Sequence, residues 1–497
     1  MDESLNRKAS VATKWSALTE FMAKLVTPVI GLVLAHLLTP EAYGIIATIT
    51  LVISFVEIFT DAGFQKYIVQ HEFQDKKDLY ESTNVAFWSN FLLSIVLWGG
   101  IIIFRDSLAT FVGSPGYGFA LSIACVGIPV AAFSSLQVAL YRRELNFKPL
   151  FKVRMVGVLV PLVVTIPLAL LFRNYWALII GTITRNIVEA IVLSIHSKWN
   201  PFFHYSFVKL KEMFNFTIWT LLESISIWLS GNVDVFIVAG VLTAHYLGLY
   251  KTASGLVSQV MDIVIVVSMP VLFSSLSRLQ NNKAKFDSFL LNFQRNLSIP
   301  VFFIGGMVFI YHDILTSIML GDQWMEAGPY IGILGITSAF MIVLSYMCSE
   351  AYRAKGRPQI SLLVQIIHVS VMAVAIHLAV GYGFTVLYIV RALLSFNIIL
   401  INGLVAFFVL RLPVGRMLMN LLVPFLAALT MVLSSFFYRM LFTSYIWQFI
   451  SMGISMCVYL CILSFFKRER LILLNLKATL WRQFAKLPFR RSERKIS

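Results

Sequence analysis

The chain alternates apolar runs of membrane-spanning length with short polar connections along almost its whole length. Fourteen runs are counted, at 11–37, 42–64, 83–104, 117–140, 150–172, 175–196, 213–241, 245–273, 291–311, 326–350, 359–380, 385–410, 415–438 and 445–466. A helix needs about 20 apolar residues to cross a bilayer. Hydrophobic residues make up 59% and charged residues 13% of the chain, which excludes a soluble enzyme, a disordered chain and a secreted disulfide scaffold. The sequence predicts an all-α polytopic membrane protein with 14 transmembrane helices.

The Lys and Arg residues between the runs fall almost entirely on one side of the predicted membrane. Of the 40 Lys and Arg residues, 29 lie at the N-terminus, in alternate connections and in the C-terminal tail. The opposite set of connections holds only Arg105, Arg173 and Arg439. Because basic residues are retained in the cytoplasm, both termini are predicted to be cytoplasmic, and the number of spans is predicted to be even.

The first predicted span is similar to the seventh when the sequence is shifted by 204 residues. Residues 14–44 then align with 218–248 without a gap, and 8 of 31 positions are identical. The most informative identities are the Trp15/Trp219 pair and the Leu-Thr-x₄-Gly turns that end at Gly44 and Gly248. A shift of six spans preserves orientation, so the pattern predicts two six-helix lobes related by a pseudo-two-fold axis along the membrane normal, with the binding cleft between them.

This repeat sets the expected domain limits: an N-lobe at 1–212, a C-lobe at 213–412, two extra helices at 413–466 and a tail at 467–497. The tail holds ten Lys and Arg residues and two Glu residues. Five apolar residues recur in it at helical spacing: Leu473, Leu476, Leu480, Trp481 and Phe484. This pattern is typical of a basic amphipathic helix on an anionic membrane surface, so membrane lipids are expected partners and nucleic acid is not. Docking of a protein partner is the alternative role.

Eight bases and seven acids fall inside the predicted spans, where each charge costs about 2.5–3.5 kcal/mol on insertion scales. They indicate a hydrated cavity. Lys24, Arg185 and Arg391 are the central bases, and they are predicted to bind substrate because Arg grips a phosphate through two hydrogen bonds. The alternative is a structural ion pair, since Glu20 and Glu189 each stand four residues away from one of these bases. Four other bases near the cytoplasmic boundary are expected to extend to the headgroups: Lys14, Lys152, Arg154 and Arg295.

Two pairs of acids also share a helix face. Glu57 and Asp61 are four residues apart, and Glu223 and Asp234 are eleven apart, which keeps them aligned unless the helix breaks between them. Neighbouring carboxylates favour binding of a proton or a cation. These four acids are therefore candidates for ion coupling, with self-neutralised structural pairs as the alternative.

Aromatic residues near the predicted cavity suit contact with sugar rings, although packing of the helix bundle is their commoner role. We assign Trp15 and Trp219 to substrate binding on this ground, with Trp228 and Tyr250 as further candidates. The four cysteines lack the spacing of a zinc site. No catalytic residue, metal ligand or cofactor is therefore predicted.

Short motifs in a characteristic order complete the pattern. They are Lys14-Trp15-Ser16-Ala17, Asp61-Ala62-Gly63-Phe64 with Ile68-Val69-Gln70, Arg143-Glu144-Leu145-Asn146-Phe147, Leu247-Gly248-Leu249-Tyr250, Leu320-Gly321-Asp322-Gln323-Trp324 and Lys355-Gly356-Arg357-Pro358. Over about 11–412 the chain resembles the polysaccharide transporter family of the MOP flippase superfamily, the Wzx-type exporters. An arrangement of 6+6+2 spans suits that family. Ser274 departs from the family, which often has Pro after Val-Leu-Phe.

The resemblance implies a flippase in the bacterial cytoplasmic (inner) membrane. It implies alternating access for undecaprenyl-diphosphate-linked oligosaccharide, coupled to H⁺ or Na⁺, in the synthesis of O-antigen, capsule or exopolysaccharide. A polysaccharide polymerase is a further expected partner. The alternatives are a multidrug or small-molecule cation antiporter on the same fold, a membrane polymerase or glycosyltransferase, and an uncoupled lipid scramblase.

Overall fold

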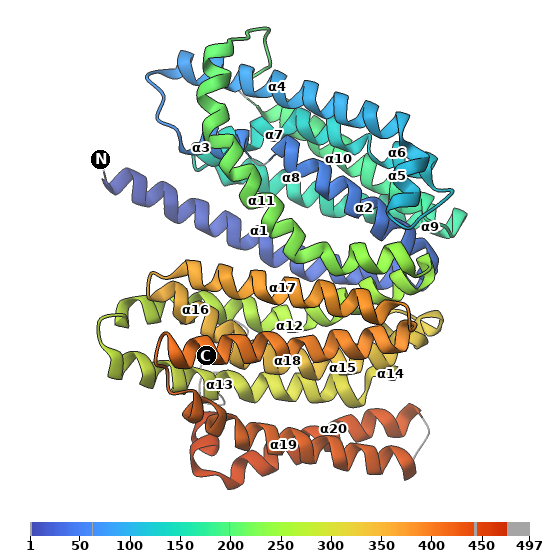
Figure 1. The fold of residues 1–497 in the computed structure, drawn as a ribbon, viewed down its shortest axis with the longest axis vertical. Helices are drawn as coiled ribbons and strands as arrows, with labels where there is room; N and C mark the ends of the chain where they lie inside the picture. Colours follow the sequence, from blue (N-terminus) through green and yellow to red (C-terminus); the bar gives the residue numbers. More distant parts are fainter. Residues whose placement is uncertain (1, 62, 198, 442–444, 475–497) are drawn as a thin grey trace, which may run out of the picture. The chain divides into compact units, whose positions relative to one another are not determined.

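The computed structural model describes residues 2–61, 63–197, 199–441 and 445–474, and within these ranges all regular structure is helical (Figure 1). The first half comprises α1 (Asp2–Leu37), α2 (Pro40–Asp61), α3 (Phe64–Gln70), α4 (Lys76–Ile103), α5 (Arg105–Phe111), α6 (Gly118–Ala124), α7 (Gly127–Arg143), α8 (Phe147–Val160), the π-helical turn η1 (Pro161–Thr165), α9 (Ile166–Phe172), α10 (Trp176–His196) and α11 (Phe207–Val241). The second half comprises α12 (Ala244–Leu279), α13 (Lys283–Ile310), α14 (His312–Met319), the 3₁₀ turn η2 (Asp322–Ala327), α15 (Gly328–Phe340), the π-helical turn η3 (Met341–Tyr346), α16 (Met347–Ala354), α17 (Pro358–Val380), α18 (Phe384–Phe408), α19 (Val414–Leu441) and α20 (Tyr445–Phe465).

The helices fall where the apolar runs predict them. Thirteen helical segments of the described residues are long and apolar enough to cross a membrane. The first predicted span, 11–37, lies wholly within α1, but its apolar stretch in the structure is the shorter segment Met22–Leu37. The structure thus agrees with a polytopic all-helical protein of about this number of spans.

Residue contacts divide the chain into two compact units. The first unit comprises Met1–Ala253, Thr316–Ala327 and Val369–Val390, and the second comprises Ser254–Leu315, Gly328–His368 and Arg391–Ser497. The division cuts through α12, α14, α17 and α18, so that one end of each helix belongs to the first unit. The lobe limits at 212 and 412 stay predictions.

The two Leu-Thr-x₄-Gly turns of the sequence repeat meet within the first unit. A Cβ atom on Gly44 would lie 1.7 Å from the Ala244 carbonyl oxygen, and one on Gly248 would lie 1.9 Å from the Pro40 carbonyl oxygen. The 204-residue shift converts Pro40 into Ala244 and Gly44 into Gly248. The contact is therefore reciprocal, as contacts across a two-fold axis are, and both positions need glycine because backbone fills the space of a side chain.

A break in the second predicted span produces the short helix α3. Gly63 begins α3 and packs against α11, where a Cβ atom would lie 2.0 Å from Thr217 Cγ2. At the other end of α3, Arg143 Nη1 donates to the carbonyl oxygens of Ile68 (2.9 Å) and His71 (2.6 Å). A cation at the C-terminal end of a helix satisfies its last carbonyl groups. Gly63 and Arg143 thus fix α3 at both ends.

In the second unit, small residues bring α13 and α15 together. A Cβ atom on Gly305 would lie 2.8 Å from Ala339 Cβ, and one on Gly335 would lie 2.5 Å from Val308 Cγ1, which is the close approach that small residues permit between membrane helices.

Arg295 of α13 differs from its predicted role. Instead of extending to the headgroups, its Nε donates to Glu469 Oε1 at 2.7 Å, and Glu469 is buried.

Candidate functional site

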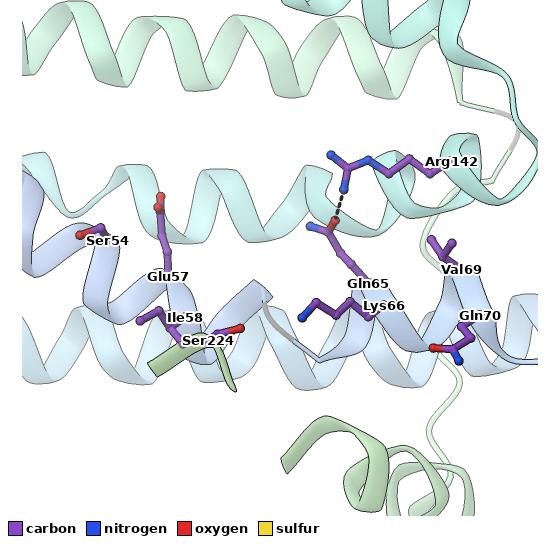
Figure 2. Close-up of a pocket in the computed structure, with 9 residues that line it drawn as sticks. All are labelled: Ser54, Glu57, Ile58, Gln65, Lys66, Val69, Gln70, Arg142 and Ser224. Atoms are coloured by element: carbon purple, nitrogen blue, oxygen red, sulfur yellow. Dashed lines mark hydrogen bonds between the residues drawn. The ribbon is translucent and has the colours of Figure 1, made fainter. Parts of the chain in front are cut away.

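A cavity of about 590 Å³ lies in the first unit between α2, α3, α7 and α11 (Figure 2). We call it the basic cavity. It is lined by Ser54, Glu57, Ile58, Gln65, Lys66, Val69, Gln70, Arg142 and Ser224. By the predicted sidedness, Lys66 and Arg142 lie toward the cytoplasm and Glu57 lies deeper in the second span. The cavity therefore joins the inner end of the unit to the predicted membrane interior.

The charges of the basic cavity are two cations and one carboxylate. The exposed Arg142 uses Nη1 to donate to Gln65 Oε1 at 3.3 Å. Figure 2 shows the exposed Lys66 side chain extending toward the end of the cavity that holds Ser54, Glu57 and Ser224. With Glu57 ionised, the lining has a net charge of +1. Cations beside amide and hydroxyl groups suit a ligand with an anionic part and a hydroxyl-rich part.

Hydrogen bonds and close packing hold the walls of the cavity in place. Trp228 Nε1 of α11 donates to Ser54 Oγ of α2 at 2.9 Å, and its ring packs against Phe55 with centroids 4.9 Å apart. Trp228 thus packs within the cavity wall, which is the alternative to its predicted contact with sugar rings. Lys66 owes its position to α3, which Gly63 and Arg143 fix as described above. The geometry of this cavity is therefore set by contacts among four different helices.

The structure describes the surroundings of two of the four predicted coupling acids, Glu57 and Asp234. Glu57 lines the basic cavity. Asp234 is buried and accepts hydrogen bonds from the Tyr250 hydroxyl (2.7 Å) and the Val235 amide (2.8 Å), but it is not part of the cavity lining. The side chains of Asp61 and Glu223 lie outside the described residues. Helix α11 continues through Gly231 and Asn232, so the break that would take Glu223 and Asp234 off one helix face does not occur.

The three predicted central bases have different surroundings. Lys24 is exposed on α1 and is not part of the basic-cavity lining. Arg185 Nε donates to Glu189 Oε1 at 2.9 Å on α10, and Glu189 packs against Gly157 of α8, where a Cβ atom would lie 1.8 Å from Oε1. The ion pair that the four-residue spacing allowed is thus formed. The substrate role of Lys24 and Arg185 stays a prediction.

Arg391 lines a separate cavity in the second unit, of about 140 Å³, between α12, α15, η3 and α18. We call it the Arg391 cavity. It combines Asp262, Tyr346 and Arg391 with four serines, Ser254, Ser258, Ser338 and Ser395. Single π-helical turns are frequent at functional sites, and η3 contributes Met341, Ile342 and Tyr346 to this wall. The cavity has one acid and one base, so its lining is formally neutral.

The predicted sugar-stacking residues are described only in part. Trp15 is half-buried and packs against Phe151 of α8 with ring centroids 5.1 Å apart, while Lys148 Nζ lies 5.9 Å from its ring centroid. These contacts join α1 to α8 and fit the packing role of Trp15. The side chain of Trp219 lies outside the described residues.

Lys66, Gln65, Gln70 and Arg142 were not among the predicted site residues. Lys66 and Arg142 count toward the positive-inside pattern. That pattern explains them as signals for membrane orientation and gives no reason to expect a cavity beside them. A signal for the site is nevertheless present in the Asp61-Ala62-Gly63-Phe64 motif. A glycine at the end of an apolar run is typical of a helix break, and the break turns the following residues into a cavity wall.

Comparison with known sequences gives one family model and several curated relatives. The model described as polysaccharide biosynthesis protein matches residues 33–329, which is more than half of the chain. An uncharacterized membrane protein in the cps region of Klebsiella pneumoniae is 22% identical over 450 residues, covering 86% of this chain and 89% of that protein. The succinoglycan biosynthesis transport protein ExoT of Rhizobium meliloti (strain 1021) is 24% identical over 333 residues, covering 66% of this chain and 65% of that protein.

Solved structures share the fold at low sequence identity. The lipid II flippase MurJ in an inward closed conformation aligns with a TM-score of 0.69 and 14% identity, covering 92% of this chain and 99% of MurJ. A multidrug resistance MATE family transporter of the MOP superfamily, in its inward-facing conformation, aligns with a TM-score of 0.59 and 13% identity, covering 79% of this chain and 94% of that one. The chain therefore has the fold of the MOP superfamily.

Proposed function

This chain belongs to the polysaccharide biosynthesis protein family, and from that premise we propose that it is a flippase for undecaprenyl-diphosphate-linked oligosaccharide repeat units. It moves them from the inner to the outer leaflet of the bacterial cytoplasmic membrane for the synthesis of O-antigen, capsule or exopolysaccharide. The observation that supports this proposal is the basic cavity, in which Lys66 and Arg142 stand beside amide and hydroxyl side chains. The transport role in the name of ExoT agrees with it.

The chemistry of the cargo explains why such a cavity is needed. Each unpaired hydroxyl group costs about 2 kcal/mol or more in hydrocarbon, so a headgroup of several sugars does not cross unaided. Lys66 and Arg142 bind the diphosphate through charge-assisted hydrogen bonds, and Gln65 and Gln70 bind sugar hydroxyls. The polyprenyl chain stays in the bilayer. Alternating access between the lobes 1–212 and 213–412 then exposes the headgroup to the outside.

We assign ion coupling to Glu57 among the four candidate acids, because it shares the basic cavity with both cations. Binding of H⁺ or Na⁺ to Glu57 raises the net charge of the lining from +1 to +2, so the charge that the diphosphate meets depends on the ion. Release of the ion has the opposite effect. Glu57→Gln fixes the neutral form, so we expect substrate to bind while export loses its dependence on the ion gradient. Export that still follows the gradient in this variant contradicts the assignment.

The alternative function on the same fold is a multidrug or small-molecule cation antiporter. Such a protein needs an acidic lining, and the two cations of the basic cavity oppose it. Lys24, Arg185 and Arg391 remain predictions for further substrate contacts along the path. Asp234 is better explained as a buried acceptor for Tyr250, which joins α11 to α12.

The proposal is tested by deleting the gene and following the lipid-linked repeat units. We expect them to accumulate on the cytoplasmic leaflet, where an impermeant enzyme or lectin added outside does not reach them. Lys66→Ala with Arg142→Ala should then lower export by more than about tenfold, since each charged hydrogen bond contributes about 1.5–3 kcal/mol. Repeat units that reach the outer leaflet at the parental rate without this protein would exclude the flippase function.

Two matched variants separate the cavity from general charge effects. Lys66→Arg keeps the cation and should retain most export. Lys76→Ala removes an exposed base at the start of α4 that does not line the basic cavity, and it should export like the parent. Normal surface polysaccharide in the Lys66→Ala, Arg142→Ala double variant would contradict the role of the cavity while leaving the flippase function standing.

A further inference from the structure

A histidine bridges two carboxylates at the end of the first unit where the repeat turns meet. His245 Nδ1 lies 2.7 Å from Glu41 Oε1, and His245 Nε2 lies 3.0 Å from Glu326 Oε2. The three residues come from α12, α2 and η2, which are far apart in the sequence. This end of the unit is the predicted outer side, because the connections at 37–42, 241–245 and 312–325 alternate with the basic ones.

Donor counting determines the charge of the bridging ring. Neutral imidazole has one N–H donor and one acceptor nitrogen, whereas imidazolium has two donors. Ionised carboxylates only accept, so a ring that hydrogen-bonds to a carboxylate through each nitrogen is the imidazolium. Loss of its proton places a nitrogen lone pair against a carboxylate oxygen, and one of the two bonds is lost. The bridge therefore exists in this form only while His245 is protonated.

The bridge lies beside the tight contacts that hold this end together. Glu41 and His245 directly follow Pro40 and Ala244, whose carbonyl oxygens contact Gly248 and Gly44. Like those four residues, Glu41 and His245 are related by the 204-residue shift. Nearby, Gln323 of η2 donates through Nε2 to the Ala35 and Leu38 carbonyl oxygens at the end of α1, both at 2.7 Å. Segments of both predicted lobes thus meet here within one compact unit.

The other titratable groups at this end have different partners. On η2, Asp322 Oδ1 accepts from Ser317 Oγ at 2.6 Å. On α1, His36 Nδ1 lies 2.9 Å from the Leu32 carbonyl oxygen of its own helix. Tyr246, next to His245, has its ring 5.3 Å from the imidazole in an edge arrangement and stacks on Phe384. Among the described residues, Glu41 and Glu326 are the charged groups that form ion pairs with His245.

We propose that His245, held between Glu41 and Glu326, is a proton-binding site that locks the outer end of the protein shut. The proposal rests on the alternating access of the proposed function. Protonation from the outside closes the bridge, and release of the proton to the outside water removes one of its two hydrogen bonds and allows the turns at Gly44 and Gly248 to separate. The site gives the transporter a response to external pH that is distinct from the coupling acid in the basic cavity.

The test measures the separation of the outer turns against pH. Thr39 and Thr243 are exposed positions of the two turns and are themselves related by the 204-residue shift. Spin labels on Thr39→Cys and Thr243→Cys, in full-length protein whose four native cysteines are replaced, report their distance by pulsed EPR in nanodiscs. In a titration that begins at about pH 5 and continues beyond the range of free imidazole, we expect a short distance at low pH and a growing population of longer distances at high pH.

Variants assign the response to one group. His245→Gln should show mostly long distances at every pH, because it removes the cation. His36→Gln is the matched control, a histidine at the same end whose Nδ1 lies beside the Leu32 carbonyl oxygen, and it should keep the parental profile. Glu41→Gln and Glu326→Gln should each weaken closure while leaving His245 in place. A parental profile that is flat, or one that His245→Gln leaves unchanged, overturns the proposal, and so does loss of the response in His36→Gln.

Failure of this site and failure of the proposed function give different results. If the deletion strain translocates its repeat units normally while the labelled protein still responds to pH through His245, the flippase function is contradicted and the proton site is supported. If the deletion blocks translocation but the distances do not respond to pH, the flippase function is supported and the proton site is contradicted.

Discussion

Two bridges of the same form hold elements of the first unit together, and they differ in the cation at their centre. On the predicted outer side, His245 joins Glu41 and Glu326. On the predicted inner side, Lys209 Nζ of α11 donates to Asp78 Oδ1 (2.9 Å) and Glu81 Oε2 (2.8 Å) of α4. Both arrangements place one cation between two carboxylates from another helix or turn.

The difference lies in when each cation loses its proton. Burial opposes the charge of Lys209, but its hydrogen bonds to Glu81 and Asp78 raise its pKa above the ordinary value. The inner bridge therefore stays charged at every physiological pH. Imidazole, unlike an ammonium group, ordinarily loses its proton near physiological pH, so of the two cations His245 is the one that can open its bridge by deprotonation. The permanent bridge joins α4 to the first turn of α11, whereas the titratable bridge joins the outer turns whose separation we propose.

The largest expected effect tests whether the outer contact must close tightly. Gly44→Val places a side chain where Cβ alone would lie 1.7 Å from the Ala244 carbonyl oxygen. Because backbone cannot move aside as a flexible side chain does, we expect export to be lost. The measurement is surface polysaccharide, with membrane insertion followed by a fluorescent fusion. Gly100→Ala, at a helical glycine of α4 where an added Cβ atom would meet nothing within 4 Å, is the control and should export normally.

The next prediction exchanges the cation of the outer bridge for that of the inner one. His245→Lys keeps a positive charge between Glu41 and Glu326 that does not titrate near neutrality. We expect the short distance between the labelled turns at every pH and export lowered by about tenfold, which is within the range of typical coupling free energies between states. Parental export with a parental pH profile in this variant would remove the distinction between the two bridges.

A smaller effect is expected at the inner bridge. Lys209→Met leaves Asp78 and Glu81 without their shared cation, so the α4–α11 contact and the thermal stability of the protein should weaken. Export should fall by less than about twofold, because partly exposed ion pairs contribute little. The pH profile of the outer turns should not change. An altered profile would mean that the two ends are coupled through α11.

The sequence predicts the helices well and the contacts between them poorly. Because each membrane span requires about 20 apolar residues, the spans can be predicted directly from the sequence. The i,i+4 spacing of Arg185 and Glu189 likewise allows their ion pair to be predicted. The basic cavity cannot be predicted in this way, because the position of Lys66 depends on the fit of Gly63 against Thr217, more than 150 residues away. The bridge at His245 likewise needs three distant segments. The place of Trp228 in the cavity wall could not be predicted for the same reason, since its partner Ser54 is 174 residues away.

The smallest expected effect concerns the Arg185–Glu189 pair and decides whether Arg185 touches substrate. Arg185→Met leaves Glu189 beside Gly157 without its cation, and an uncompensated charge in a partly buried position is more harmful than the absence of both charges. If the pair is only structural, export should fall by a few-fold at most in Arg185→Met and recover in the double variant Arg185→Met, Glu189→Leu. If Arg185 also binds the diphosphate, the double variant cannot recover, because the cation is still missing. Surface polysaccharide measured in both variants separates the two roles, and recovery would leave Lys66 and Arg142 as the cations that hold the cargo in the first unit.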